Sequence, residues 1–376
     1  MIKTKLRNLV TEYSLRNRNG SCTDVYSVTN SQGFIPSTDY FSKEVFSKDL
    51  TTYKIVKKGM IAYNPSRINV GSVAVQRVAE EVIVSPLYVV FSVNEDELIP
   101  EYLTYFLHSD KGLHQISSNT SGSVRDSLKF TALQNIEINT YSLEEQKEII
   151  VKFQKFERLI EKQKALLKKL DDLVKSQFIE MFGDMASNDK CWDIVPLSEI
   201  AEYFNGLTYK PENVSDDGLI VFRSSNIQDS ELDFADIVRV DSKVKEKLFV
   251  KDGDILMCSR NGSAKLVGKV AEINRLKEPA TFGAFMMVIR SAYPKYLLTY
   301  FKLPVFREQI KVGATTTINQ ITSSMLDKIR LPLPPQVLIN EYSQFVEQTD
   351  KSKFRIKQSL EKLEKCYKAL LQKYFG

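Results

Sequence analysis

The sequence has few of the residues that build reactive or cross-linked sites. Its four cysteines stand far apart, at positions 22, 191, 258 and 366. This spacing predicts neither a zinc site nor a disulfide framework, and it favours a reducing, cytoplasmic compartment. The two histidines, His108 and His114, are six residues apart. A helix would place them on different faces, so we expect surface roles and no catalysis.

Long hydrophobic runs are also absent. No stretch of about 18 apolar residues occurs, and the charged start Met1-Ile-Lys-Thr-Lys5 has no apolar segment behind it. We therefore expect a protein that is neither secreted nor membrane-spanning. The net charge of +5 permits binding to nucleic acid but does not by itself indicate it.

Motifs for cofactor binding are incomplete. Gly262 to Lys269 resembles a phosphate loop, but five residues separate its glycines and no Ser or Thr follows the lysine. Tyr63-Asn-Pro-Ser66 resembles the Asn-Pro-Pro-Tyr motif of DNA adenine methyltransferases, but it lacks the second proline and the stacking aromatic residue. The sequence therefore predicts no catalytic residue, no metal site and no cofactor on this chain.

The chain contains an internal repeat with a period of about half its length. Val56-Lys-Lys-Gly-Met-Ile61 aligns with Val250-Lys-Asp-Gly-Asp-Ile255, and Pro100-Glu-Tyr-Leu103 aligns with Pro294-Lys-Tyr-Leu297. The ends of the halves match best, whereas the central loops diverge. Two domains with a common scaffold and different binding loops would show this pattern. A gene duplication without functional meaning is the alternative.

Each half ends in a long segment without glycine or proline, in which apolar residues recur in steps of three and four. This period of 3.5 is typical of a coiled-coil seam, and the outer positions carry interleaved Lys and Glu. The expected seam residues are Phe153, Phe156, Ile160, Leu167, Leu170 and Val174 in the first half, and Val346, Ile356, Leu360, Leu363, Tyr367 and Leu370 in the second. Roughly 40 residues would form a helix of about 60 Å.

Local signals mark where these helices begin. Ser142 followed by Glu145 is typical of a capping box, and Leu331-Pro-Leu-Pro-Pro335 is tolerated only before a helix. We expect domains at residues 1–142 and 195–335, spacer helices at 143–183 and 336–376, and a linker at 184–194. If a pseudo-two-fold axis relates the halves, the helices lie antiparallel.

Each domain is predicted to be mixed α and β, so the fold class is α+β. Short β-rich runs include Val25–Val28, Val82–Val84, Tyr88–Val93 and Phe285–Arg290, and a helix is expected from Pro100 to Ile116, with a twin that starts at Pro294.

Polar, loop-like clusters that could contact DNA interrupt these strands. Arginine and lysine suit guanine edges, asparagine and glutamine suit adenine, and serine or threonine suits phosphate. Ordinary solvated loops would have the same composition. The candidate DNA-binding residues are Asn64, Ser66, Arg67, Asn69, Ser72, Arg125, Arg223, Asn226, Ser259, Arg260, Asn261, Ser263, Lys265, Thr317, Asn319 and Gln320.

Across the whole chain these features resemble the specificity subunits of type I restriction-modification systems. The resemblance rests on the tandem halves, the Leu331–Pro335 segment, the Lys-Leu pairs at 169 and 362, the Phe-Gly endings at 183 and 376, and the Ser-Arg segments at 66 and 259. The first half departs from the family pattern, because Asn139-Thr-Tyr-Ser142 replaces the proline-rich segment.

The resemblance implies two target-recognition domains that each contact one half of a bipartite double-stranded DNA site, with paired helices that set the gap. It also implies two copies of a methylation subunit and restriction subunits as partners, which would bind S-adenosylmethionine and ATP themselves. A coiled-coil scaffold or oligomerisation protein with two small binding domains is the alternative. A self-contained methyltransferase is a further alternative.

Overall fold

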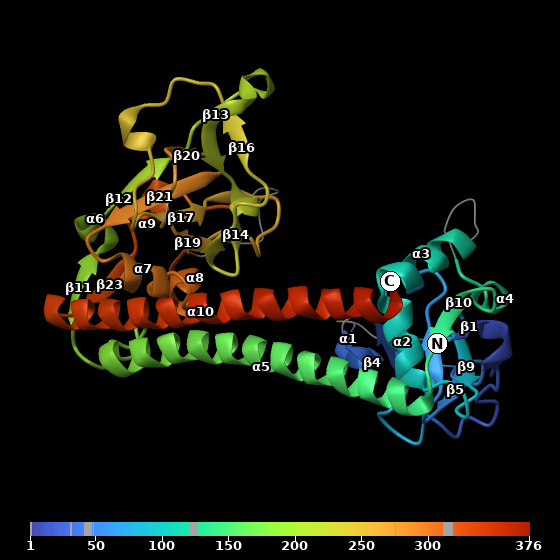
Figure 1. Ribbon diagram of the computed structural model, residues 1–376. Helices are drawn as coiled ribbons and strands as arrows, with labels where there is room; N and C mark the ends of the chain where they lie inside the picture. Colours follow the sequence, from blue (N-terminus) through green and yellow to red (C-terminus); the bar gives the residue numbers. More distant parts are fainter. Residues whose placement is uncertain are drawn as a thin grey trace. The chain divides into compact units, whose positions relative to one another are not determined.

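The computed structural model describes residues 2–30, 32–40, 47, 49–120, 127–274, 276–310 and 319–376. The chain forms two compact units (Figure 1). Unit 1 comprises Met1–Ala165 and Ile356–Gly376, and unit 2 comprises Leu166–Arg355. Each unit therefore contains one globule, the beginning of one long helix and the end of the other.

The globule of unit 1 is built on a four-stranded antiparallel sheet in the order β2-β9-β6-β7. Three two-stranded pairs, β1-β10, β3-β4 and β5-β8, surround it. The strands are β1 (Ile2–Lys5), β2 (Val10–Glu12), β3 (Tyr26–Thr29), β4 (Gly33–Pro36), β5 (Lys54–Lys57), β6 (Ile61–Tyr63), β7 (Val73–Val75), β8 (Glu81–Val84), β9 (Val89–Val93) and β10 (Glu137–Thr140). The helices are η1 (Leu6–Asn8), α1 (Ser37–Tyr40), η2 (Ile68–Val70), α2 (Pro100–His108), α3 (Asp110–Asn119) and α4 (Phe130–Leu133).

The globule of unit 2 repeats this plan, with the central order β12-β21-β17-β19. Its strands are β11 (Asp193–Pro196), β12 (Ala201–Asn205), β13 (Val214–Phe222), β14 (Ile227–Gln228), β15 (Glu231–Leu232), β16 (Val238–Val240), β17 (Ile255–Cys258), β18 (Arg260–Asn261), β19 (Val270–Glu272), β20 (Ala280–Phe282), β21 (Met286–Ser291), β22 (Asn319–Gln320) and β23 (Arg330–Leu333). Its helices are α6 (Leu197–Ile200), η3 (Pro211–Asn213), η4 (Ser224–Asn226), η5 (Glu246–Leu248), α7 (Pro294–Tyr300), α8 (Pro304–Ile310) and α9 (Ser323–Leu326).

The strand register shows that the sequence repeat is a structural repeat. Ile61 pairs with Phe91 in unit 1, and Ile255 pairs with Ile289 at the same place in unit 2. The predicted fold class, two similar mixed α/β domains with two long helices, is confirmed.

Both long helices begin where the sequence signals predict. Helix α5 (Leu143–Phe182) is preceded by Ser142, whose hydroxyl accepts a hydrogen bond from the Glu145 amide at 3.3 Å, while the Glu145 carboxylate accepts one from the Ser142 amide at 3.0 Å. These reciprocal bonds form the predicted capping box. Helix α10 (Gln336–Phe375) starts directly after Pro335, whose carbonyl accepts the first helical hydrogen bonds.

The two helices run antiparallel within each unit. In unit 1 the Phe153 ring stacks on Phe375 with centroids 6.0 Å apart, and Lys164 pairs with Glu364 at 3.3 Å. In unit 2 the Lys353 ammonium lies 2.6 Å from the Asp171 carboxylate. As the residue number increases along α5, the partner's number falls along α10.

The residues expected at the seam are covered, and most positions between them are exposed. Phe153 and Val346 are buried. The other expected seam residues are partly buried: Phe156, Ile160, Leu167, Leu170, Val174, Ile356, Leu360, Leu363, Tyr367 and Leu370. Partial burial is what a two-helix seam provides, because only one side of each helix is covered.

The end of each long helix packs into a globule core. In unit 2, Phe178 and Phe182 form a fully buried ring cluster with Tyr296 and Tyr342, with centroids 4.9 to 5.4 Å apart. In unit 1, Phe375 lies 5.0 Å from Tyr102, which corresponds to Tyr296. The Phe-Gly endings of the two halves therefore anchor the helices in apolar cores.

One predicted helix is interrupted. The segment from Pro100 to Ile116 forms α2 and α3, separated by Ser109, whose extended backbone ends the first helix. The Ser109 hydroxyl accepts a hydrogen bond from the Gly112 amide at 3.1 Å and caps the second helix. The helical periodicity continues across this break, so apolar spacing alone did not reveal it.

Within the described ranges, no helix combines the length and hydrophobicity needed to cross a membrane. The same residues contain no group of three or more Cys, His, Asp or Glu side chains placed to hold a metal ion.

Candidate nucleic-acid interface

The structure brings several candidate residues together at one edge of unit 2. The short strand β18 pairs with β22, so that Arg260 lies opposite Gln320 and Asn261 opposite Asn319. The Arg260 guanidinium donates to the Gln320 side-chain oxygen at 2.6 and 3.2 Å. The sequence places these residues about 60 positions apart, and only the β-pairing makes them neighbours.

An aromatic ring completes this cluster. The Arg260 guanidinium carbon lies 5.9 Å from the centre of the Phe285 ring, and the Phe285 carbonyl accepts hydrogen bonds from the amides of Ser259 and Arg260. Phe285 nevertheless remains 60% exposed. An exposed ring beside an arginine and two amide side chains can hold the guanidinium plane in place for contact with a base edge.

Asn261 starts a polar loop that ends at a buried anchor. The Asn261 side chain donates to the Ser224 hydroxyl at 3.5 Å and accepts from the Ser263 amide at 3.0 Å. Ser263 and Lys265 are exposed, whereas the loop returns to the core at Val267, whose carbonyl accepts from Arg307. The loop is therefore fixed at both ends and presents polar groups between them.

Three other candidates in unit 2 have mainly structural contacts. Asn226 is fully buried, and its amide donates to the carbonyls of Asp233 and Asp236 at 3.0 and 2.9 Å. Ser259 is buried, and its carbonyl accepts a hydrogen bond from the Ile321 amide at 2.7 Å. The Arg223 guanidinium pairs with the Asp236 carboxylate at 2.8 Å, at the surface.

In unit 1 the corresponding loop leads from β6 into η2. Ser66, Arg67 and Asn69 are exposed, and the Asn64 side chain accepts from the Ser66 amide at 3.0 Å. Asn69 also lines a cavity of about 750 Å³ next to α2. These four residues thus form a polar edge directly after β6. The Arg260 cluster, formed by Arg260, Asn261, Phe285, Asn319 and Gln320, lies after the corresponding strand β17 in unit 2.

Ser72 differs from its neighbours, because it is buried and its hydroxyl donates to the Val28 carbonyl at 2.6 Å. Next to it, the His108 ring lies 3.0 Å from the Gly71 carbonyl. His108 is half-buried, and burial holds the pKa of its imidazole below the ordinary value. The expected surface role for this histidine is therefore wrong: it fixes the end of the η2 loop.

Two candidates, Arg125 and Thr317, lie outside the described residues. Conversely, Phe285 was expected inside a strand, but β21 begins one residue later and Phe285 occupies the turn. The register places Leu87 at the equivalent turn of unit 1, where it is 79% exposed. An apolar residue next to a strand end gives no sequence signal that distinguishes a turn tip from a core position.

These two surfaces present groups that can form hydrogen bonds. Among the described residues the clusters offer guanidinium, amide and hydroxyl groups. The nearby Cys258 thiol is buried, and burial raises its pKa, so it is held in the protonated form.

The comparison with known families matches this arrangement. A model described as the type I restriction modification DNA specificity domain matches residues 14–171 and again residues 189–365. The chain belongs to this specificity-domain family. The two matched segments correspond to the two halves of the repeat, so the specificity domain occurs twice in this chain.

Two curated relatives of this specificity-domain chain are the specificity subunits of the type I restriction enzymes StySPI, from Salmonella potsdam, and EcoKI, from Escherichia coli strain K12. Each is 30% identical over 193 residues, which is 48% of this chain. The matched part covers 42% and 41% of those subunits, less than half their length.

Two solved structures share the specificity-domain fold over the whole chain. The S subunit of the type I restriction-modification system of M. genitalium has a TM-score of 0.57 and 16% identity, with 100% of this chain and 96% of that one covered. A chain from a study of complex assembly and conformational transition of the type I R-M system has a TM-score of 0.58 and 18% identity, with 100% and 97% covered. At these identities the similarity establishes the fold.

Proposed function

We propose that this chain is the DNA-specificity subunit of a type I restriction-modification enzyme and that it recognises a bipartite double-stranded DNA site. The observation that carries the proposal is the duplicated scaffold with unlike polar edges: Asn64 to Asn69 in unit 1 and the Arg260 cluster in unit 2. Residues 1–142 and 195–335 would be the two target-recognition domains. Each would contact one half-site of different sequence.

Arg260 is the residue that we expect to contact a guanine. A guanidinium can donate two parallel hydrogen bonds to the O6 and N7 atoms of guanine, and Gln320 and Phe285 limit the directions in which it can point. Asn261, Asn319 and the exposed Ser263 and Lys265 would contact neighbouring bases or phosphates.

The long helices would set the gap between the half-sites. Half-sites on one face of a duplex lie roughly 34 to 36 Å apart, or a multiple of this distance. A helix of 40 residues, such as α5 or α10, has a length of about 60 Å. The spacer helices are therefore long enough to set a separation of this size.

The curated relatives are named as subunits of restriction enzymes, which supports partners of the same kind for this chain. We propose two copies of a methylation subunit and restriction subunits as partners. S-adenosylmethionine and ATP would bind to those partners, and this chain would be a non-catalytic cytoplasmic subunit.

The decisive experiment is the sequencing of methylated adenines in host cells with and without this gene. We expect one bipartite motif to disappear with the gene. Loss of no motif would contradict the proposal and favour the coiled-coil scaffold. Binding of S-adenosylmethionine by the purified chain, measured by calorimetry, would favour the self-contained methyltransferase.

The assignment of Arg260 has its own test. We expect Arg260→Ala to relax specificity at one base of one half-site, at a cost of about 1 to 3 kcal/mol in binding. Lys265→Ala, on the exposed loop nearby, is the comparison, because loss of a phosphate contact weakens binding to all sequences alike. A uniform loss for Arg260→Ala would assign Arg260 to the phosphate backbone instead.

A further inference from the structure

Equivalent carboxylates on the two long helices hold the globules. Glu157 on α5 and Asp350 on α10 are 193 residues apart (350 − 157), the same offset that relates Phe182 to Phe375 (375 − 182). The Glu157 carboxylate accepts a hydrogen bond from Tyr105 at 2.9 Å, and the Asp350 carboxylate accepts one from Lys295 at 3.0 Å. Tyr105 and Lys295 lie on α2 and α7, the corresponding helices of the two globules.

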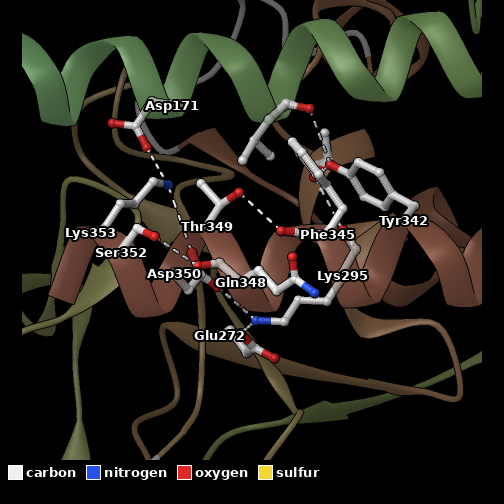
Figure 2. Close-up of polar contacts among 12 residues, drawn as sticks. Asp171, Glu272, Lys295, Tyr342, Phe345, Gln348, Thr349, Asp350, Ser352 and Lys353 are labelled. Carbon is white, nitrogen blue, oxygen red and sulfur yellow. Dashed lines mark hydrogen bonds and ion pairs between the residues drawn. The ribbon is translucent and has the colours of Figure 1, made fainter. Parts of the chain in front are cut away.

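In unit 2 this carboxylate belongs to a chain of ion pairs that joins four elements (Figure 2). Lys295 pairs with Glu272 of β19 at 2.5 Å and with Asp350, and it is only 11% exposed. Lys353 then lies 3.8 Å from Asp350 and 2.6 Å from Asp171 of α5. Burial lowers the pKa of Lys295, but the charges and hydrogen bonds of Glu272 and Asp350 raise it by more than burial lowers it. The net shift of the pKa is therefore upward, and the ammonium stays charged.

In unit 1 the equivalent carboxylate, that of Glu157, is hydrogen-bonded to neutral partners. The Glu157 carboxylate accepts hydrogen bonds from Tyr105 of α2 and Tyr367 of α10, both at 2.9 Å. Burial, with the nearby Glu157 charge, raises the pKa of both tyrosines well above the ordinary value, so both hydroxyls remain donors. One carboxylate therefore connects the globule to both long helices.

The remaining contacts between globule and helices are both polar and apolar. The buried Gln146 side chain of α5 accepts a hydrogen bond from the Ile99 amide and donates one to the Glu97 carbonyl, both at 2.9 Å, and the Thr299 hydroxyl of α7 lies 2.8 Å from the Tyr342 hydroxyl of α10.

Among the apolar contacts, the Tyr105 ring stacks on the Phe153 ring in unit 1, with centroids 4.6 Å apart. In unit 2 the Phe178 ring of α5 stacks on the Tyr296 ring of α7, with centroids 5.3 Å apart. Apolar contacts supply stability but have little directional preference, whereas hydrogen bonds to a charged group fix an orientation. Among these hydrogen bonds, those to Glu157 and Asp350 have a charged acceptor, which makes them the strongest directional contacts of each attachment.

We propose that Glu157 and Asp350 are positioning residues that fix the orientation of each globule on its helix pair, and through it the gap length that the protein accepts. This inference rests on the proposed function. It separates the residues that determine half-site sequence, at the polar edges, from those that determine half-site spacing, at the helices.

The test uses the full chain assembled with its methylation subunits and a DNA library in which the half-sites are fixed and the gap varies. We expect the variants Glu157→Gln and Asp350→Asn to lower the preference for the correct gap over a gap one base pair longer by about tenfold, with the half-site sequences unchanged. Glu161→Gln and Glu347→Gln, which alter exposed carboxylates on the same helices, are the controls and should keep the original preference.

Milder variants guard against misfolding. Tyr105→Phe and Tyr367→Phe each remove one hydrogen bond to Glu157 and keep the ring. If all variants fold and keep the original gap preference, this inference is overturned, while the proposed function still holds. A change in half-site sequence would also overturn it, because these residues would then belong to base recognition. A wild-type chain with no bipartite motif would instead overturn the proposed function, and this inference with it.

Discussion

At Gly183, directly after α5, the backbone has a φ of +78°, and a Cβ atom would lie 2.0 Å from an Asp189 carboxylate oxygen. We expect Gly183→Ala to destabilise unit 2 by at least about 1 kcal/mol, because left-handed backbone disfavours a side chain. Gly262→Ala is the control, since no atom lies within 4 Å of its Cβ position. Equal urea-unfolding curves for the two variants would contradict this account.

His108 leads to a prediction about pH. Because burial lowers the pKa of this imidazole in the folded state, the unfolded chain binds the proton first as the pH falls below about 6.5. Unit 1 should therefore lose stability from pH 6.5 downward until the lowered pKa is reached. His108→Gln should reduce the difference in unfolding free energy between pH 7.5 and pH 5.5. An unchanged difference would show that His108 does not contribute to the pH dependence.

On the scale of the elements, the end of α5 holds the core of unit 2. We expect Phe178→Ala to destabilise the protein by about 3 to 5 kcal/mol, because it leaves a cavity inside a fully buried ring cluster. Leu173→Ala, at a position of α5 that is 45% exposed, should cost far less. Thermal unfolding of both variants would compare them, and similar losses would mean that the cluster is less important than its packing indicates.

The elements also show the limits of local patterns. The heptad spacing and the capping box at Ser142 are local features, so the long helices could be predicted closely. The break at Ser109 depends on how α3 packs: a Cβ on Gly112 would lie 2.0 Å from the Phe106 carbonyl. That close approach is decided by tertiary packing and leaves no trace in the apolar periodicity.

On the scale of the whole molecule, the proposed division of labour predicts independent half-sites. Replacing residues 195–335 with the corresponding domain of a family member of different specificity should change one half of the methylated motif and leave the other half and the gap unchanged. Methylated-base sequencing would measure both halves at once. A change in both halves would mean that the two domains do not act independently.

The helices give the complementary prediction. Inserting one heptad into both α5 and α10 preserves the seam and adds about 10.5 Å to each helix, at 1.5 Å per residue. The accepted gap should then grow by about three base pairs, with both half-site sequences unchanged. If the same motif with the original gap is still methylated, the helices do not set the spacing.

The sequence by itself determined the duplicated mixed domains and the two long helices, because these depend on periodicity and capping within a few residues of each position. It also identified polar segments that could contact DNA. Only the tertiary structure separated Arg260 and Gln320, which share an exposed edge, from Ser72 and Asn226, whose side chains are buried in internal hydrogen bonds. A polar residue in a loop-like segment looks the same in the sequence whether its side chain is exposed or buried. Pairing between distant segments decides which of these side chains face solvent.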